Sequence, residues 1–541
     1  MFVKLSASVL LFTSFALGQS TSAIQGTVTD ATGRAIPGAS VTVRDPAHGV
    51  DRQQATDSAG IYYVPALPVG TYSVVVKAPG MALTEAKGIV LDVGMTVKQD
   101  FALNVASSAQ VVEVQASGPL VDTSTASLTS VVDAREVQEI PLNGRHFVDL
   151  AQLTTGTVQG PANGSLTVPL RGQGTFSFNS AGGREDTVNF MVNGINMNDS
   201  NNQQVTFQPT INTVDEFIVD NSTFSAEYGR NSGSIVNVAT RPGVNIWHGE
   251  AYDFLRNADL DARNYTNPAN LPKAEFIRNQ FGGDGGGAIK KDKTFVYLSY
   301  EALRQRQAYA LSSTTLTAAQ YAQAQATSDA AIKSLLSLIP APNSGTNQYV
   351  FTAPSPVNIQ QGTVNFSQII SPAHRLNVYY AIQQDYRGEP PTTDGNSFPN
   401  EGDNRGGRRQ LISLNESWVI SPSLVNEARA GANRIHIVFN PDVLTNPQGY
   451  NINDGVTTAI GLPSMSISGG FTFGSSSISA RGDLTDVVAD TLSWIHGRHT
   501  VRMGFEERRQ NSNNISTSPG SFGFASINAF LADTASSFST T

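Results

Sequence analysis

The chain has 541 residues, which exceeds what one hydrophobic core can organise and predicts at least two or three domains. Its 44 acidic and 35 basic residues give a net charge of −9 without a dense basic cluster, which argues against nucleic acid as a partner. Cysteine is absent, which excludes thiol catalysis, cysteine-based zinc sites and disulfides. Only 15% of residues are charged and 48 are glycine, a composition that favours strands and polar loops.

Residues 1–18 predict a secretory signal peptide. Lys4 precedes an apolar run from Leu5 to Leu17, and small residues precede Gln19. That run is too short to span a bilayer, and no later stretch has about 18 uninterrupted apolar residues. For an exported chain without spanning helices, the β-barrel is the membrane architecture that stays possible.

Residues 24–103 predict a small antiparallel β-sandwich. Short strand-like runs recur between turn signals such as Pro37-Gly38 and Pro79-Gly80. The segments GTVTDATGRAIPGASVTV, TDSAGIY and LPVGTYSVVV resemble the carboxypeptidase regulatory-like, transthyretin-like domain. Despite the name of that family, the resemblance implies a sandwich without catalytic activity.

Residues 104–123 predict a polar linker, and residues 124–243 predict a mixed αβ unit. A helix is expected to open at Asp133, which suits an N-cap, and Asn193-Gly194 is expected to close a tight turn. A buried apolar strand is expected at 234–240. A second helix from about Arg145 is expected to bury Phe147, Leu150 and Leu153.

From residue 244 to 541 the pattern changes to long alternating strands, about nine or ten in number. Short turns and long polar loops connect them in a regular way, and a helix is expected inside one loop from Thr317. This asymmetry favours the first part of an outer-membrane barrel over a soluble sandwich. So few strands cannot enclose a folded domain, so we expect an incomplete, open sheet. The expected turns are 371–375, 421–423 and 496–499, and the expected loops are about 304–361, 388–406 and 438–482.

The stretch FSAEYGRNSGSIVNVATRPG, residues 224–243, resembles the end of the plug domain of TonB-dependent outer-membrane receptors. IPLNGRHFVDL and FMVNGINMND upstream, and WHGEAYDFLRNADLDARNY and KKDKTFVYLSYEALRQRQ downstream, resemble the Oar-like branch of that family. The resemblance implies a mainly β protein of the Gram-negative cell outer membrane, with a periplasmic sandwich, a plug over 124–243 and the first part of a barrel. It implies the periplasmic TonB system, outer-membrane lipid and an extracellular substrate as partners. Asn193 stands where the family has an aspartate.

The resemblance also proposes roles for individual residues. Glu227, Arg230 and Arg241 are expected to contact the barrel wall, with solvated charges and a ligand site as alternatives, and Gly229 and Gly233 to allow close backbone approach. The segment Val111, Val112, Glu113, Val114, Gln115 and Ala116 resembles a TonB box, which would pair with the energising partner by β-augmentation. An ordinary edge strand would have the same pattern.

Other motifs do not support chemistry. GGDGGGAIKK lacks the GK[ST] of a phosphate loop, HGRH at 496–499 lacks a carboxylate partner for zinc, and NGINMNDSNN lacks EF-hand spacing for calcium. No GxSxG elbow is present, so we identify no catalytic, cofactor or metal residue. The predicted function is import of a large substrate such as an oligosaccharide or peptide. The alternative is an outer-membrane adhesin that uses the barrel as an anchor.

Overall fold

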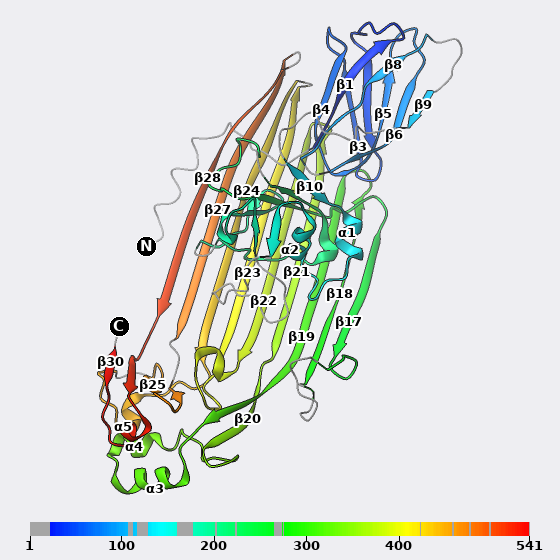
Figure 1. Cartoon of the computed structure of the whole chain (residues 1–541). Helices are drawn as coiled ribbons and strands as arrows, with labels where there is room; N and C mark the ends of the chain where they lie inside the picture. Colours follow the sequence, from blue (N-terminus) through cyan, green and yellow to red (C-terminus); the bar gives the residue numbers. More distant parts are fainter. Residues whose placement is uncertain are drawn as a thin grey trace.

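The chain is mainly β, with a sandwich at one end of a large sheet, an αβ unit against one face of that sheet, and a loop-built domain at the far end (Figure 1). The predicted signal peptide lies outside the described residues. The computed structural model describes residues 22–92, 94–105, 112–115, 128–159, 177–200, 203–221, 224–263, 273, 275–421, 423–456, 459–474, 478–496 and 499–539.

The sandwich has two sheets that enclose one apolar core. Alternate residues of its strands point inward, so Val41, Val43, Val74 and Val76 are fully buried. Most pairings are antiparallel as predicted, but β1 pairs in parallel with β7 and β8, and β6 with β9, because strands far apart in sequence meet there. One sheet contains β1 (Ser22–Asp30), β4 (Ile61–Leu67), β7 (Thr96–Lys98) and β8 (Phe101–Leu103). The other contains β2 (Ser40–Asp45), β3 (Val50–Ala55), β5 (Gly70–Lys77), β6 (Thr84–Leu91) and β9 (Val112–Gln115).

The αβ unit is built on a five-stranded sheet with two short helices. Helix α1 (Ala134–Glu139) begins where predicted, because Asp133 and Glu136 form a capping box. Helix α2 (Phe147–Leu150) buries Phe147 and Leu150, whereas Leu153 is 59% exposed, so that part of the prediction is wrong: a 3₁₀ turn at Ala151–Leu153 rotates it away from the core. The sheet order is β10 (Thr129–Val132), β15 (Val214–Asp220), β16 (Ile235–Thr240), β13 (Asn189–Val192) and β14 (Ile195–Asn196).

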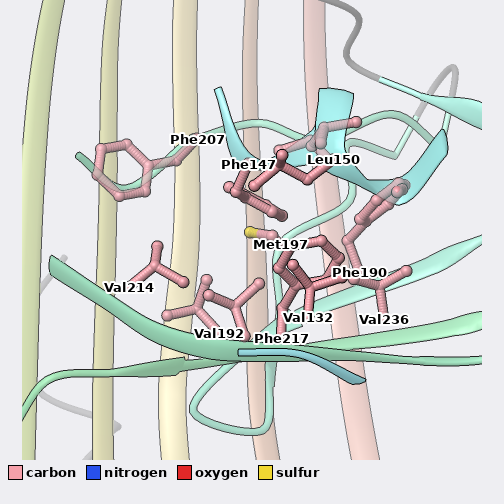
Figure 2. Close-up of a cluster of buried hydrophobic side chains, with 14 of the residues drawn as sticks. Val132, Phe147, Leu150, Phe190, Val192, Met197, Phe207, Val214, Phe217 and Val236 are labelled. Atoms are coloured by element: carbon pink, nitrogen blue, oxygen red, sulfur yellow. The ribbon is translucent and has the colours of Figure 1, made fainter. Parts of the chain in front are cut away.

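The core of the αβ unit packs its helices and connecting loops onto this sheet (Figure 2). Phe147 of α2 meets Phe217 of β15 edge to face, with ring centroids 5.7 Å apart, and Phe190 and Val236 are buried beside them. A short ribbon, β11 (Thr157–Gln159) with β12 (Phe178–Ser180), extends this unit. The unit therefore has an apolar core of its own.

The large sheet has ten strands, all paired antiparallel, with β17 and β28 at its edges, so the described strands form an open sheet. The three predicted tight turns are confirmed, because β21 leads into β22, β23 into β24 and β27 into β28 within a few residues. Along the sheet the order is β17 (His248–Asn257), β18 (Phe276–Lys290), β19 (Thr294–Thr314), β21 (Val357–Ser371), β22 (His374–Glu389), β23 (Asp403–Ser421), β24 (Leu424–Pro441), β27 (Ser479–His496) and β28 (His499–Ser516). Strand β20 (Gln348–Pro354) pairs with the end of β19.

The two faces of this sheet differ as the sequence alternation predicts. On β21, Thr363, Asn365 and Ser367 are buried beneath the αβ unit, and this side is called the inner face. Val364, between them, is 40% exposed on the opposite outer face. Tyr379 of β22 points inward and joins the core of the αβ unit.

The long loops form a folded domain rather than polar connections, which corrects the prediction. Helices α3 (Ala318–Thr327) and α4 (Ala330–Leu335) stand where one helix was expected, and both pack with α5 (Ile527–Leu531). Widely spaced apolar residues from three loops and the C-terminal segment meet in one core, which no single segment reveals. Its four-stranded sheet has β25 (Ser464–Ile467), β26 (Thr472–Phe473), β29 (Ser521–Phe524) and β30 (Ser537–Ser539). Across the described ranges, no helix is both long and apolar enough to cross a membrane.

Candidate functional site

The interface between the αβ unit and the inner face of the large sheet is the candidate functional site. The β13–β14 hairpin lies against β23 and β24, where Asn415 Nδ2 donates to the Asn193 carbonyl at 3.3 Å. Both turn residues have positive φ, 47° for Asn193 and 78° for Gly194, as a tight hairpin turn of this kind needs. A Cβ on Gly194 would lie 2.1 Å from Arg429 Nη1 and would displace that side chain, and the φ of 78° itself favours glycine here.

A second contact joins β23 and β24 to the loop after the hairpin. Arg409 Nη1 donates to the Thr206 carbonyl at 2.8 Å while its Nε lies 3.3 Å from Asp385 on β22. The Thr206 hydroxyl lies 2.7 Å from the Asn433 side-chain oxygen on β24. Arg409 is only 2% exposed, so these partners compensate for the loss of water around its buried charge.

A buried ionic cluster forms a third contact. Arg481 of β27 lies between Asp199 of the αβ unit, at 3.1 Å, and Asp483 of its own strand, to which its Nε donates at 2.7 Å. The three side chains are at most 4% exposed. One arginine of the large sheet therefore pairs with a carboxylate on each side of the interface.

The strands at the other edge hold the segment around α2. Arg278 Nη1 donates to the Asn143 side chain at 2.9 Å, and the Arg145 guanidinium lies 4.1 Å from the centre of the Phe254 ring. His146, the residue after Arg145, is 5% exposed. Burial, followed by repulsion from Arg278, lowers the pKa of His146 to about 3, so the ring is neutral.

The three predicted contact residues lie in different surroundings. Glu227 pairs with Arg502 of β28 at 3.2 Å, across the interface. Arg241 lies 3.9 Å from Asp215 within the αβ unit, and its backbone carbonyl accepts from Asn365 Nδ2 at 2.9 Å. Arg230, with φ 66°, borders a cavity of about 840 Å³ that also touches Glu227, Arg429 and Arg502.

The glycines flanking this segment also differ. A Cβ on Gly233 would lie 2.8 Å from the Thr187 carbonyl, so the predicted close approach is present there. A Cβ on Gly229 would meet no atom of the described residues within 4 Å, so that prediction is wrong. The sequence analysis did not identify four arginines on the inner face of the large sheet, which are called the wall arginines: Arg278, Arg409, Arg429 and Arg481. Each occupies an inward-facing position in the alternation of its strand, and that is the signal that could have identified them.

The described part of the candidate TonB box is β9, Val112–Gln115. It pairs in parallel with β6, Thr84 opposite Val112 and Lys87 opposite Gln115, and forms the end strand of its sheet. Val111 and Ala116 lie outside the described residues. In the described ranges no strand occupies the far edge of β9, which leaves it open to strand addition.

The sandwich closes the tight-turn end of the site. Asn245, just before β17, donates from Nδ2 to the Pro46 carbonyl at 2.7 Å. The turn Leu67–Val69 borders a cavity of about 90 Å³ together with Asp215 and Asn365. Burial there raises the pKa of Asp215, against the opposing effect of Arg241 and His48.

Comparison with known families identifies the large sheet. The family model of the outer membrane beta barrel domain matches residues 239–541, more than half of the chain. The chain belongs to the outer-membrane β-barrel domain family. It is therefore a protein of the cell outer membrane, whose barrel sheet bears the αβ unit on its inner face. The carboxypeptidase regulatory-like domain matches residues 23–104 of this barrel protein.

Two individual proteins are similar to this outer-membrane barrel chain. The TonB-dependent transporter Oar of Myxococcus xanthus is 26% identical over 312 residues, which cover 54% of this chain and 28% of the relative. The outer membrane transporter YddB of Escherichia coli matches with a TM-score of 0.50 and 10% identity over 73% of this chain and 50% of its own, which shows the shared fold. The chain thus spans about a quarter of the length of the first and half of the second.

Proposed function

We propose that this chain is part of a TonB-dependent outer-membrane transporter of the Oar-like type and that the αβ unit is its plug. The observation that carries the proposal is the docking of that unit by polar side chains of the inner face from β18 to β28. The similarity to the relative named as a TonB-dependent transporter supports it. The chain acts by binding and transport rather than by catalysis.

The chemistry of the docking suits a plug that moves. Exposing apolar surface to water costs about 25 cal/mol per Å². Separating buried ion pairs and hydrogen bonds costs little, because water hydrates the groups that lose their partners. The wall offers Arg409 and Arg481, and the plug offers the Thr206 carbonyl and the Asp199 carboxylate. A pulling force could therefore replace these contacts by water, and the apolar contacts that it must also expose are those of Tyr379, Ala381 and Leu411 with the plug core.

The substrate we propose is large and polar, such as an oligosaccharide or a peptide. Beyond the plug, toward the loop-built domain, the inner face carries ion pairs, among them Arg405 with Asp403 at 2.8 Å and the contacting pair Arg387 and Glu389. Such pairs offer donors and acceptors to a polar ligand. On the tight-turn side, the cavity of about 840 Å³ beside Arg230 and Arg502 provides space for release.

The periplasmic TonB system is the proposed energising partner, and β9 its proposed docking strand. Its open edge would accept a strand of the partner through backbone hydrogen bonds. Pairing with β6 then connects the pull to the sandwich, which contacts the tight-turn end of the barrel through Asn245 and Pro46.

The test is energised substrate uptake in cells. Replacing residues 111–116 by a flexible Gly/Ser segment of equal length should abolish uptake while surface binding and membrane insertion remain. The control variant Val112→Ala with Val114→Ala keeps the backbone donors and should retain most uptake. Adhesion that persists without TonB, together with uptake unaffected by the replacement, would instead favour an adhesin whose loop-built domain is the binding part.

A further inference from the structure

We propose that the outer face of the barrel sheet carries a binding groove for a phosphorylated lipid head group of the outer leaflet. The groove lies across β19, β21, β22, β23 and β24 and has a volume of about 670 Å³. Three arginines and a histidine border it: Arg304, Arg306, Arg408 and His436. Neither the family membership nor the proposed transport assigns a role to it.

These side chains lie on the face opposite the αβ unit. Arg304 occupies the same alternation as Leu298 and Tyr300 of β19, which are 46% and 49% exposed. Arg408 shares its alternation with Ile412 and Leu414 of β23, which are 37% and 39% exposed. The arginines therefore point toward the membrane side of the sheet.

The groove lies at the level where head groups are expected. On the same face of β23, Trp418 stacks on His374 near the tight turns, with ring centroids 5.0 Å apart, and Arg408 lies ten residues earlier on the strand. At about 3.4 Å per residue and a strand tilt of about 40°, this distance corresponds to about 26 Å of membrane thickness. The apolar band of such barrels is about 25 Å tall, so Arg408 lies at its far boundary.

Aromatic and apolar side chains mark that band. Tyr300 and Tyr386 lie on the outer face near the groove, where their rings suit the interface between acyl chains and head groups. Val364 and Ile412 lie closer to the tight turns on neighbouring strands. A lipid whose head group occupies the groove would thus place its chains along this band.

The charge of the groove favours an anion. In the described part of the chain, the carboxylate that borders the groove is Asp385, which points to the inner face and pairs with Arg409 at 3.3 Å. Arg304 Nη1 donates to the Ile359 carbonyl at 2.6 Å, and Arg306 Nη1 to the Asn358 side chain at 3.0 Å. These bonds hold both guanidinium groups in place with further N–H donors available, which matches the oxygens of a phosphate.

The experiment uses the whole protein in a neutral detergent, titrated with bis-phosphorylated lipid A and with its dephosphorylated form. Binding is measured by native mass spectrometry. We expect the phosphorylated lipid to bind at least about tenfold more tightly, and the triple variant Arg304→Gln, Arg306→Gln and Arg408→Gln to lose that preference. The corresponding triple lysine variant should keep most of it.

A charge-matched control distinguishes the groove from general attraction. Arg34→Gln, Arg44→Gln and Arg135→Gln remove the same charge from exposed positions outside the large sheet and should leave lipid binding unchanged. Equal weakening in both glutamine variants, equal binding of the two lipids by the native protein, or displacement of the lipid by an equal concentration of inorganic phosphate would overturn the proposal. The comparison of the two lipids on the native protein decides the question even if the groove variant does not fold.

Discussion

The neutral, buried His146 predicts that the αβ unit loses stability in mild acid. In the folded protein its pKa is lowered to about 3 by burial and by Arg278, whereas in an unfolded chain it returns to the ordinary value of 6.5. Between these values the unfolded state binds a proton that the folded state does not. Unfolding is therefore favoured progressively as the pH falls below about 6.5.

The magnitude follows from the linkage relation for one group. From pH 7.5 to pH 5, a group that stays neutral when folded and titrates at 6.5 when unfolded reduces the free energy of unfolding by about 2 kcal/mol. That is a large part of the stability of a small unit. His146 Nε2 has no hydrogen-bond partner among the described residues, so no acceptor there favours a proton on this nitrogen.

The measurement is pulse proteolysis of the whole protein across a urea series at pH 7.5 and pH 5, following cleavage within residues 128–243. The control is His146→Gln, which removes the titrating ring and keeps a polar side chain of similar length. We expect the native protein to lose about 2 kcal/mol more than the variant between the two pH values. An identical pH dependence in both proteins would refute the reasoning, whatever their absolute stabilities.

Further predictions concern a glycine pair, a loop carboxyl and the sandwich. Gly194→Ala should weaken docking of the αβ unit by about 0.5 to 1 kcal/mol more than Gly182→Ala in the same pulse-proteolysis assay. Both glycines have similar φ, 78° and 77°, but only at Gly194 would the new Cβ displace the Arg429 side chain; equal effects would contradict this. Burial raises the pKa of Glu401 to about 8, so it is protonated in the folded loop domain and destabilises that domain as the pH rises from about 4.5 to 8. In the Glu401→Gln variant, thermal unfolding monitored by proteolysis should show a loop domain whose stability no longer falls with rising pH in this way. An unchanged pH dependence would exclude the Glu401 carboxyl as its cause. Residues 22–105 expressed alone should give a β-type circular dichroism spectrum and a cooperative melt, whereas a disordered spectrum would show that the sandwich needs the barrel.

Local signals in the sequence predicted those features that local chemistry determines. The capping box of Asp133 and the hairpin at Asn193-Gly194 depend on residues a few positions apart, so their residue types suffice. The faces of the barrel strands follow from the predicted alternation, so the neighbouring residues Asn365 and Val364 lie on opposite sides.

Features that depend on distant segments could not be predicted in this way. The loop-built domain joins Phe398, Phe473 and Phe530 from three separate parts of the chain. The predicted loop over 304–361 contains the end of β19 and all of β20, because exposed strands and loops share a polar composition. The parallel pairing of β9 with β6 likewise joins strands far apart in the sequence.

The wall arginines show the same limit and also explain how the site is organised. The sequence pointed to charges on the plug side, at Glu227, Arg230 and Arg241, because they flank the strand 234–240 in the segment that resembles the end of a plug domain. Most cations at the interface instead come from the wall, where Arg409 and Arg481 reach a backbone carbonyl and a carboxylate of the αβ unit. Every residue has a backbone carbonyl, so the plug needs no particular residue type at Thr206 to accept the hydrogen bond from Arg409. Most of the core of the αβ unit comes from its own residues, with Tyr379, Ala381 and Leu411 added by the barrel sheet, so the polar contacts can be exchanged for water without unfolding the unit. The arrangement thus separates what holds the unit together from what holds it in place.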